Sequence, residues 1–162
     1  MMLAYRTIGN VPTLPCGVST VILERSITST MRGKTILVVD DEPHIRHMLD
    51  YKLGRAGFTV ITASNGVDAL RIARERRPHL MVTDLQMPGG DGLTLCLKLN
   101  EQPDTATIPV IMLTARGYKV PPSDLGRTNI KSLVPKPFSP RELLAQVQEL
   151  LDASQDNEAD AA

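Results

Sequence analysis

The stretch TILVVDDEP, residues 35–43, decides the fold class of this chain. Its first five residues form a nearly continuous apolar run, which is typical of a strand buried on both faces of a parallel sheet. Asp40, Asp41 and Glu42 follow directly, and Pro43 suits the first position of a helix because its missing N–H group costs nothing there. The stretch therefore predicts a buried strand, an acidic turn and a helix in immediate succession.

The same alternation continues along the chain. Further short apolar runs predict four more strands, at residues 58–62, 80–83, 110–113 and 132–134. Helical spacing predicts helices between them, at residues 43–56, around Val67, Leu70 and Ala73, and around Leu93, Cys96 and Leu97. A last helix begins with Ser139 as its cap and Pro140 at its first position. This alternation predicts an α/β fold with a parallel sheet and right-handed crossovers.

The fourth connection departs from the pattern. Residues 116–131 read RGYKVPPSDLGRTNIK, and Pro121 and Pro122 each lack a backbone donor and crowd the preceding turn. We therefore expect an irregular fourth helix, or only a short helical turn, in this interval.

Three regions of the chain differ in texture. Residues 1–32 mix Pro, Gly, Ser and Thr with isolated apolar residues, so we expect a poorly ordered N-terminal extension. Residues 33–152 carry the alternating pattern and form the predicted domain, whereas residues 153–162 are small and acidic and predict a flexible tail. Translation could begin at Met31 instead of Met1, and the intact mass of the native protein would distinguish the two starts.

Charge and composition exclude several classes of protein. Lys and Arg number 18, as do Asp and Glu, so the zero net charge gives no sign of a nucleic-acid or anionic-membrane partner. No apolar run approaches the ~20 residues that span a bilayer, and the N-terminus lacks the pattern of a secretory signal. Cys16 and Cys96 show no metal-ligand spacing and predict unpaired thiols in a reducing compartment. We therefore expect a cytoplasmic protein.

Polar side chains that carry chemistry follow the predicted strands. Asp40 and Asp41 end the first strand, Asp84 the third, Thr114 the fourth and Lys136 the fifth. In an open parallel sheet ligands bind beyond the carboxyl ends of the strands, so we expect these side chains to converge on one edge. Clustered carboxylates repel one another unless a cation joins them, and their hard oxygen atoms suit Mg²⁺.

The same edge suits phosphoryl transfer. A carboxylate such as that of Asp84 can attack phosphorus and form an aspartyl-phosphate. The Lys136 ammonium and the Thr114 hydroxyl can hold equatorial oxygens of the phosphoryl group while Mg²⁺ neutralises another. The residues alone therefore indicate a Mg²⁺-dependent phosphoryl site.

Four motifs resemble those of the response-regulator receiver family of two-component signalling: VVDDEP at 38–43, TDLQMPGGDG at 83–92, LTA at 113–115 and PKPF at 135–138. One acidic pair alone would be weak, whereas four motifs in order at strand ends are specific. The resemblance covers the predicted domain. It implies the doubly wound, five-stranded parallel sheet of the flavodoxin-like receiver fold, with strand order 2-1-3-4-5.

The resemblance also implies the acceptor and the metal ligands. Asp84 would be the phosphoacceptor. Mg²⁺ would bind the carboxylates of Asp40, Asp41 and Asp84 and the backbone carbonyl of Gln86. The glycines within residues 89–92 would shape the loop after the acceptor.

The remaining family positions surround the phosphoryl group. Thr114, Ala115 and Lys136 would bind it and switch with it, and the peptide bond before Pro137 would be cis. Family members often carry a Tyr or Phe three residues before the lysine, which swings inward on activation. Leu133 occupies this position, an altered aromatic switch. Together with the irregular fourth helix, this change falls on the surface that relatives use for partner binding.

The leading interpretation is a single-domain response regulator. It would take a phosphoryl group from a histidine kinase or phosphotransfer protein and dock to an unknown output protein, as a monomer or weak dimer. A phosphatase of the haloacid-dehalogenase type also uses an aspartate nucleophile, but it needs a second Asp where this chain has Gln86. A constitutive interaction module, in which phosphorylation is idle, would fit Leu133 and the irregular helix.

Some single features have simpler interpretations. Asp40 and Asp41 alone could stabilise the start of a helix. His44 and His47 lie one helical turn apart and could bind a metal, but with no third ligand in view solvated side chains are the better interpretation. The arginines within residues 74–77 fit a solvated helix end.

Overall fold

A computed structural model of the chain describes the backbone of residues 31–160 and the side chains of residues 31–155. The predicted extension before Met31, with Cys16, lies outside the described residues. Residues from Met31 onward cluster as one unit, and Met31 itself is buried in its core, slightly before the predicted boundary. Within the described part, no helix is both long and apolar enough to cross a membrane.

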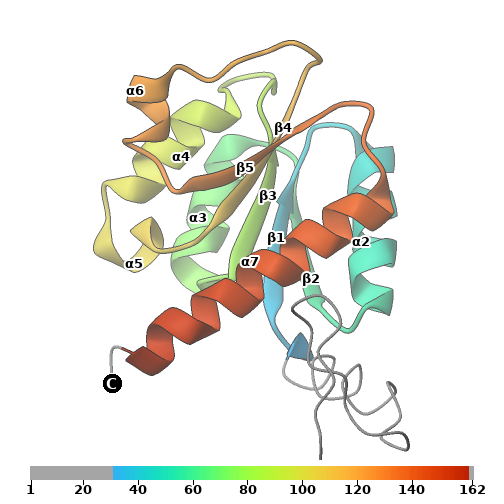
Figure 1. Cartoon of the computed structure of the whole chain (residues 1–162). Coiled ribbons are helices and arrows are strands. Elements are labelled where there is room, and N and C mark those ends of the chain that lie inside the picture. Colours follow the sequence, from blue (N-terminus) through green and yellow to red (C-terminus); the bar gives the residue numbers. More distant parts are fainter. Residues whose placement is uncertain (1–30, 161–162) are drawn as a thin grey trace, which may run out of the picture. The chain divides into compact units, whose positions relative to one another are not determined.

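Five parallel strands form the sheet, in the order β2-β1-β3-β4-β5 (Figure 1). The strands are β1 (Thr35–Val39), β2 (Thr59–Ala63), β3 (Leu80–Asp84), β4 (Val110–Thr114) and β5 (Ile130–Pro135). This order confirms the doubly wound α/β fold predicted from the sequence. It places β1 and β3 side by side, at the point where the strand order reverses.

Helices cover both faces of the sheet. One face carries α2 (Pro43–Arg55) and α7 (Pro140–Asp160), which contact each other (Figure 1). The other face carries α3 (Gly66–Arg76), α4 (Gly92–Asn100), α5 (Pro103–Ala106) and α6 (Pro122–Leu125).

Strand residues alternate between two hydrophobic clusters, one on each face of the sheet. In β1, Ile36 and Val38 pack with residues of α2 and α7, whereas Leu37 and Val39 pack with residues of α3 and α4. All four side chains are at most 1% exposed. Burial on both faces is the physical reason for the continuous apolar runs in the sequence.

The outer strands differ slightly from their predicted bounds. β2 begins at Thr59, one position later than predicted, because the N–H of Phe58 bonds to the carbonyl of Leu53 at the end of α2. β5 runs from Ile130 to Pro135 and is longer than predicted, because Ile130 pairs with Val110 of β4. The interior strands β1, β3 and β4 lie where the sequence predicts them, within one residue.

Two helices correct the predicted pattern. Val67, one of the residues that predicted this helix, is 76% exposed, whereas Ala69 and the predicted Ala73 of α3 are buried in the cluster on this face of the sheet. The short helix α5, which begins at Pro103, was not predicted. In the fourth connection the only helix is α6, a four-residue turn starting at Pro122, as the proline pair predicts.

The last helix is longer than predicted. α7 has the predicted cap, since the N–H of Glu142 bonds to Ser139 Oγ at 3.4 Å. It continues to Asp160, whereas the sequence predicts a flexible tail from residue 153. Ser154 Oγ donates to the carbonyl of Leu150 at 2.8 Å, so a polar side chain bonds to the helix backbone near the predicted end.

Leu37→Ala should lower the free energy of unfolding by roughly 2–5 kcal/mol, because it deletes buried methyl groups and leaves a cavity. Val67→Ala, at a side chain that is 76% exposed, should change this free energy by no more than about 0.5 kcal/mol. Urea unfolding followed by circular dichroism measures both. Equal effects would contradict the placement of Leu37 in the core.

Candidate functional site

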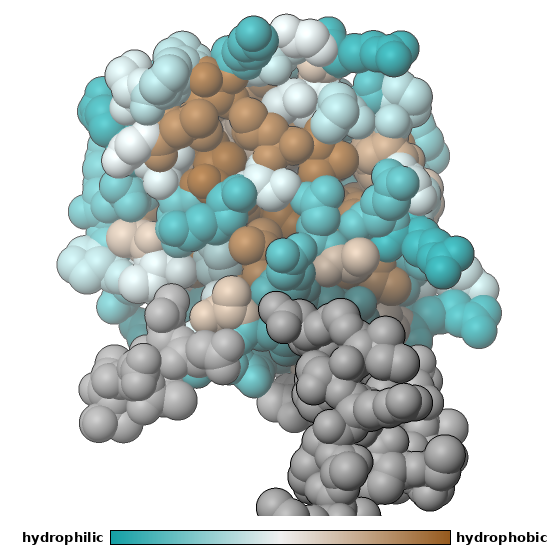
Figure 2. All heavy atoms as spheres, viewed as in Figure 1, coloured by the Kyte–Doolittle hydropathy of each residue, from teal (hydrophilic) through white to brown (hydrophobic). Residues whose placement is uncertain are grey.

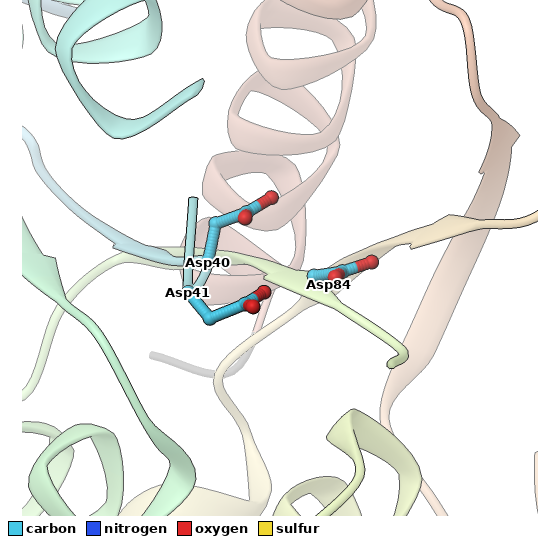
Figure 3. A group of neighbouring side chains, drawn as sticks. All are labelled: Asp40, Asp41 and Asp84. Carbon is cyan, nitrogen blue, oxygen red and sulfur yellow. The ribbon is translucent and has the colours of Figure 1, made fainter. Parts of the chain in front are cut away.

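Two neighbouring strands position the acidic side chains. Val39 of β1 pairs with Thr83 of β3, so the residues that follow them, Asp40 and Asp84, lie at the same level of the sheet. Asp41 comes next, and one oxygen of each of the three carboxylates lies within 4.8 Å of the others. Figure 3 shows the three side chains grouped at the carboxyl ends of β1 and β3. The predicted convergence of carboxylates is therefore present.

Asp40 is fully buried and held from several directions. Its Oδ1 accepts from the N–H of Glu42 at 2.9 Å, and its Oδ2 lies 3.2 Å from Lys136 Nζ. The carbonyl oxygens of Asp40 and Asp41 accept from Arg46 Nη1 at 2.6 and 3.0 Å. The N-cap residue of α2 is Glu42, and its side chain makes no capping hydrogen bond.

Lys136, directly after β5, brings a positive charge to the cluster. Its Nζ lies 3.2 Å from Asp40 Oδ2, 3.4 Å from Asp84 Oδ1 and 3.6 Å from Glu42 Oε1. Its backbone N–H donates to the carbonyl of Thr114 at 2.7 Å, which sets the point where the side chain leaves the sheet. One ammonium therefore contacts three carboxylates from the β1 and β3 ends of the sheet.

Burial and charge act on the titration of this cluster in opposite directions. Burial raises the pKa of the Asp84 carboxyl above its ordinary 3.8; the Lys136 ammonium opposes the rise, and the Asp40 carboxylate adds to it. Burial lowers the pKa of Lys136, but the carboxylates of Asp40 and Asp84 more than offset burial and leave this pKa raised. Lys136 is therefore a cation at neutral pH, and Asp84 carries a charge that the fold disfavours.

The donor set fits a divalent cation. The three aspartates are the only group of acidic, His or Cys side chains in residues 31–155 whose atoms lie close enough to hold a metal. Their charge exceeds that of Lys136, and such repulsion is relieved by a cation. Mg²⁺ prefers hard oxygen ligands of this kind and keeps several waters. His44 does not join the group; its Nε2 lies 3.4 Å from Glu42 Oε2.

The other predicted positions surround the cluster or lie at the surface. Thr114 is buried at the end of β4, and Ala115 after it is exposed. Gln86 is exposed in the loop that follows β3. The peptide bond before Pro137 is cis. Leu133, on β5, is 36% exposed.

Comparison with known proteins assigns this fold and site to a family. The model of the response regulator receiver domain matches residues 36–148. The chain belongs to this family. It is a receiver domain of two-component signalling, a signalling switch and not a catalyst, and its acidic triad is typical of the Mg²⁺ site of receivers.

Relatives of this receiver agree with the assignment. The alkaline phosphatase synthesis transcriptional regulatory protein PhoP of Bacillus subtilis is 42% identical over 76% of this chain and 50% of that protein. The chain spans about half the length of the curated relatives it matches. The chemotaxis response regulator CheY4 of Vibrio cholerae is 29% identical, with a TM-score of 0.67 over 72% of this chain and 98% of that one.

A third relative was solved with a metal. The receiver domain of a sensor histidine kinase from Pseudomonas aeruginosa is 25% identical, with a TM-score of 0.67 over 74% of this chain and 98% of that one. That structure has a magnesium ion coordinated in its active site cleft.

Close approach of α4 to the end of β3 in this receiver requires Gly92. A Cβ atom at position 92 would overlap the carbonyl oxygen of Asp84 and lie 3.2 Å from Leu85 Cα. The N–H of Gly92 donates to the carbonyl of Leu85 at 2.8 Å and links the start of α4 to the end of β3. A side chain at this position would displace the backbone that carries Asp84.

Sequence reasoning missed two residues of the receiver site. Glu42 contacts Lys136, and Arg46 bonds to the backbone of the acidic turn. Their positions in the sequence could have indicated these contacts, because Glu42 ends the acidic run and Arg46 lies one helical turn after it.

The arginines within residues 74–77 were predicted to be solvated. Arg77 differs from this prediction in one respect, because it pairs with Asp104 at 2.9 Å, although both side chains are exposed.

Gly92→Ala should destabilise the receiver by roughly 1–3 kcal/mol, because the added methyl group has no room beside the Asp84 backbone. Gly54→Ala is the matched control within α2, where an added Cβ meets nothing within 4 Å. It should stabilise by up to about 1 kcal/mol, because Ala favours the helix. Urea unfolding gives both values, and a neutral Gly92→Ala would refute the close approach.

Asp84→Asn should raise the melting temperature at pH 7 in Mg²⁺-free buffer. Because the folded state raises the pKa of Asp84, its contribution to stability is present below the ordinary pKa of 3.8 and is lost as pH rises through the raised value. Asn cannot ionise, so the gain should shrink as pH falls toward 3.8.

Asp50→Asn, at an exposed position of α2, is the matched control and should change the melting temperature little at either pH. Thermal unfolding at pH 7 and pH 4 measures both variants. A lower melting temperature for Asp84→Asn at pH 7 would contradict the direction of the shift.

Proposed function

We propose that Asp84 of this receiver accepts a phosphoryl group, in the presence of Mg²⁺, from a histidine kinase or a phosphotransfer protein. The chain would act in the cytoplasm as a phosphorylation switch or relay, by docking to an output protein. One observation carries the proposal: three carboxylates and the Lys136 ammonium meet at the carboxyl edge of the sheet.

Asp84 is the acid best placed to react. Lys136 contacts both Asp40 and Asp84, but Asp40 is 0% exposed whereas Asp84 retains 6% exposure. A carboxylate oxygen of Asp84 would attack phosphorus and form a P–O bond while the P–N bond of a donor phosphohistidine breaks. The bonding electrons leave with the histidine nitrogen. The product is an aspartyl-phosphate.

The neighbouring residues have defined tasks in this reaction. Asp40, Asp41 and Asp84, with the backbone carbonyl of Gln86, would hold Mg²⁺, which when bound neutralises charge on the phosphoryl oxygens. The Lys136 ammonium would bind a second oxygen of the group.

Two residues at the end of β4 complete the phosphoryl pocket. The Thr114 hydroxyl would donate to a phosphoryl oxygen. The small side chain of Ala115 would leave the approach to Asp84 open. Movement of Thr114 toward the new charge would couple phosphorylation to the loop that follows β4.

Readout of the switch would involve the edge of the sheet at β5. Leu133 is 36% exposed and replaces the aromatic residue that often reports activation in this family, so the readout would not depend on an inward-swinging ring. Tyr118, in the loop after β4, is also exposed at 42%. Figure 2 shows hydrophobic residues gathered on this face, over α6 and β5. We propose this face as the region where an output protein docks, with the free chain a monomer or weak dimer.

Incubation with acetyl phosphate and Mg²⁺ should add one phosphoryl group to the full chain, seen by intact mass. The adduct should be absent in Asp84→Asn and after removal of Mg²⁺ with EDTA, because both changes remove parts of the acceptor site. Asp50→Asn, at an exposed position of α2, should be labelled like the wild type. An adduct that persists in Asp84→Asn would place the acceptor elsewhere.

A further inference from the structure

The side chain of Arg46 contacts the backbone behind the acidic cluster. Its Nη1 donates to the carbonyl oxygen of Asp40 at 2.6 Å and to that of Asp41 at 3.0 Å. One guanidinium nitrogen carries two hydrogens and can serve both carbonyls at once. The backbone N–H of Arg46 donates to the carbonyl of Glu42 at 3.2 Å. The first turn of α2 therefore holds the acidic turn at all three of its residues.

These bonds restrain the two aspartates unequally. Asp40 is also held through its carboxylate, by the N–H of Glu42 and by Lys136 Nζ. For Asp41, the bond from Arg46 is the one hydrogen bond that residues 31–155 supply. A backbone change at Asp41 that redirected its Cβ, and with it the carboxylate, would also move its carbonyl oxygen and break this bond. Arg46 is thus the group that opposes such a change.

We propose that Arg46 is a positioning residue for the divalent-cation site, which keeps the carboxylates of Asp40 and Asp41 turned toward Asp84. The inference rests on the proposed function, because it assigns Arg46 a role toward the Mg²⁺ site. Groups that orient metal ligands change metal affinity by roughly 10- to 100-fold when they are removed. Lys136 bonds to carboxylate oxygens, whereas Arg46 bonds to carbonyl oxygens behind them and leaves the ligand atoms available.

Calorimetric titration of the full chain with MgCl₂, without any phosphodonor, tests the proposal. Arg46→Gln should weaken Mg²⁺ binding about 10-fold. Arg46→Lys keeps the charge but loses the planar fork, so it should weaken binding as well, by a smaller factor. Arg55→Gln is the matched control: it removes the same charge from the same helix, where Arg55 bonds to the exposed Tyr51 hydroxyl at 2.9 Å. Its Mg²⁺ affinity should equal that of the wild type.

A second measurement distinguishes a role of Arg46 in positioning the Mg²⁺ ligands from a role in the phosphorylation reaction itself. With acetyl phosphate, Arg46→Gln should need about 10-fold more Mg²⁺ for half-maximal labelling of Asp84, while saturating Mg²⁺ restores the extent of labelling. If the wild type binds Mg²⁺ but is never labelled, the proposed function fails and the calorimetric comparison still judges Arg46.

Several results would overturn the positioning role. Wild-type Mg²⁺ affinity in Arg46→Gln would do so, and full affinity in Arg46→Lys would show that charge alone matters. An equal loss in Arg55→Gln would also assign the effect to charge. If circular dichroism shows that Arg46→Gln does not fold, the Mg²⁺ affinity of Arg46→Lys tests the role instead, and wild-type affinity in that variant would overturn it. A wild type that binds no Mg²⁺ would overturn this inference and the proposed function together.

Discussion

The meeting of three carboxylates with one ammonium at the end of the sheet is the constraint on which the rest of this receiver depends. Like charges held together at a buried site repel, and burial itself disfavours ionised Asp84. The parallel ladder between β1 and β3 nevertheless places Asp40 and Asp84 at one level. Lys136 offsets part of the repulsion, and the excess negative charge is what makes the site fit a divalent cation.

Stability for this arrangement comes from outside the site. Each of the central strands is buried on both faces, between α2 and α7 on one side and α3 and α4 on the other. Close backbone packing adds to the effect, because Gly92 lets α4 begin directly against the end of β3. The acidic cluster can therefore retain an unfavourable charge without loss of the fold, and its carboxylates are already grouped as a divalent cation would need them.

In the proposed function, chemistry and readout occupy different parts of the sheet. The reactive groups follow β1, β3, β4 and β5 at one edge, and hydrogen bonds between neighbouring strands and turns hold them. Leu133 lies on β5, the outer strand of the sheet, and its side chain is 36% exposed. The short helix α6 lies in the connection before this strand. Under the proposed function, a change there would alter the surface offered to a partner without touching Asp84.

The sequence by itself determined the fold class, the strand order through family resemblance, and the meeting of three aspartates with Lys136 at the ends of the strands. Apolar runs and the residues that follow them are local patterns, and parallel topology brings strand ends together. Tertiary structure alone decided the exposure of Val67, the overlap that requires Gly92, and the contacts of Glu42 and Arg46. Lys136 and Asp40 are 96 positions apart in the chain, and which atoms meet over such a separation depends on how helices and turns pack. Local sequence periodicity does not predict that packing.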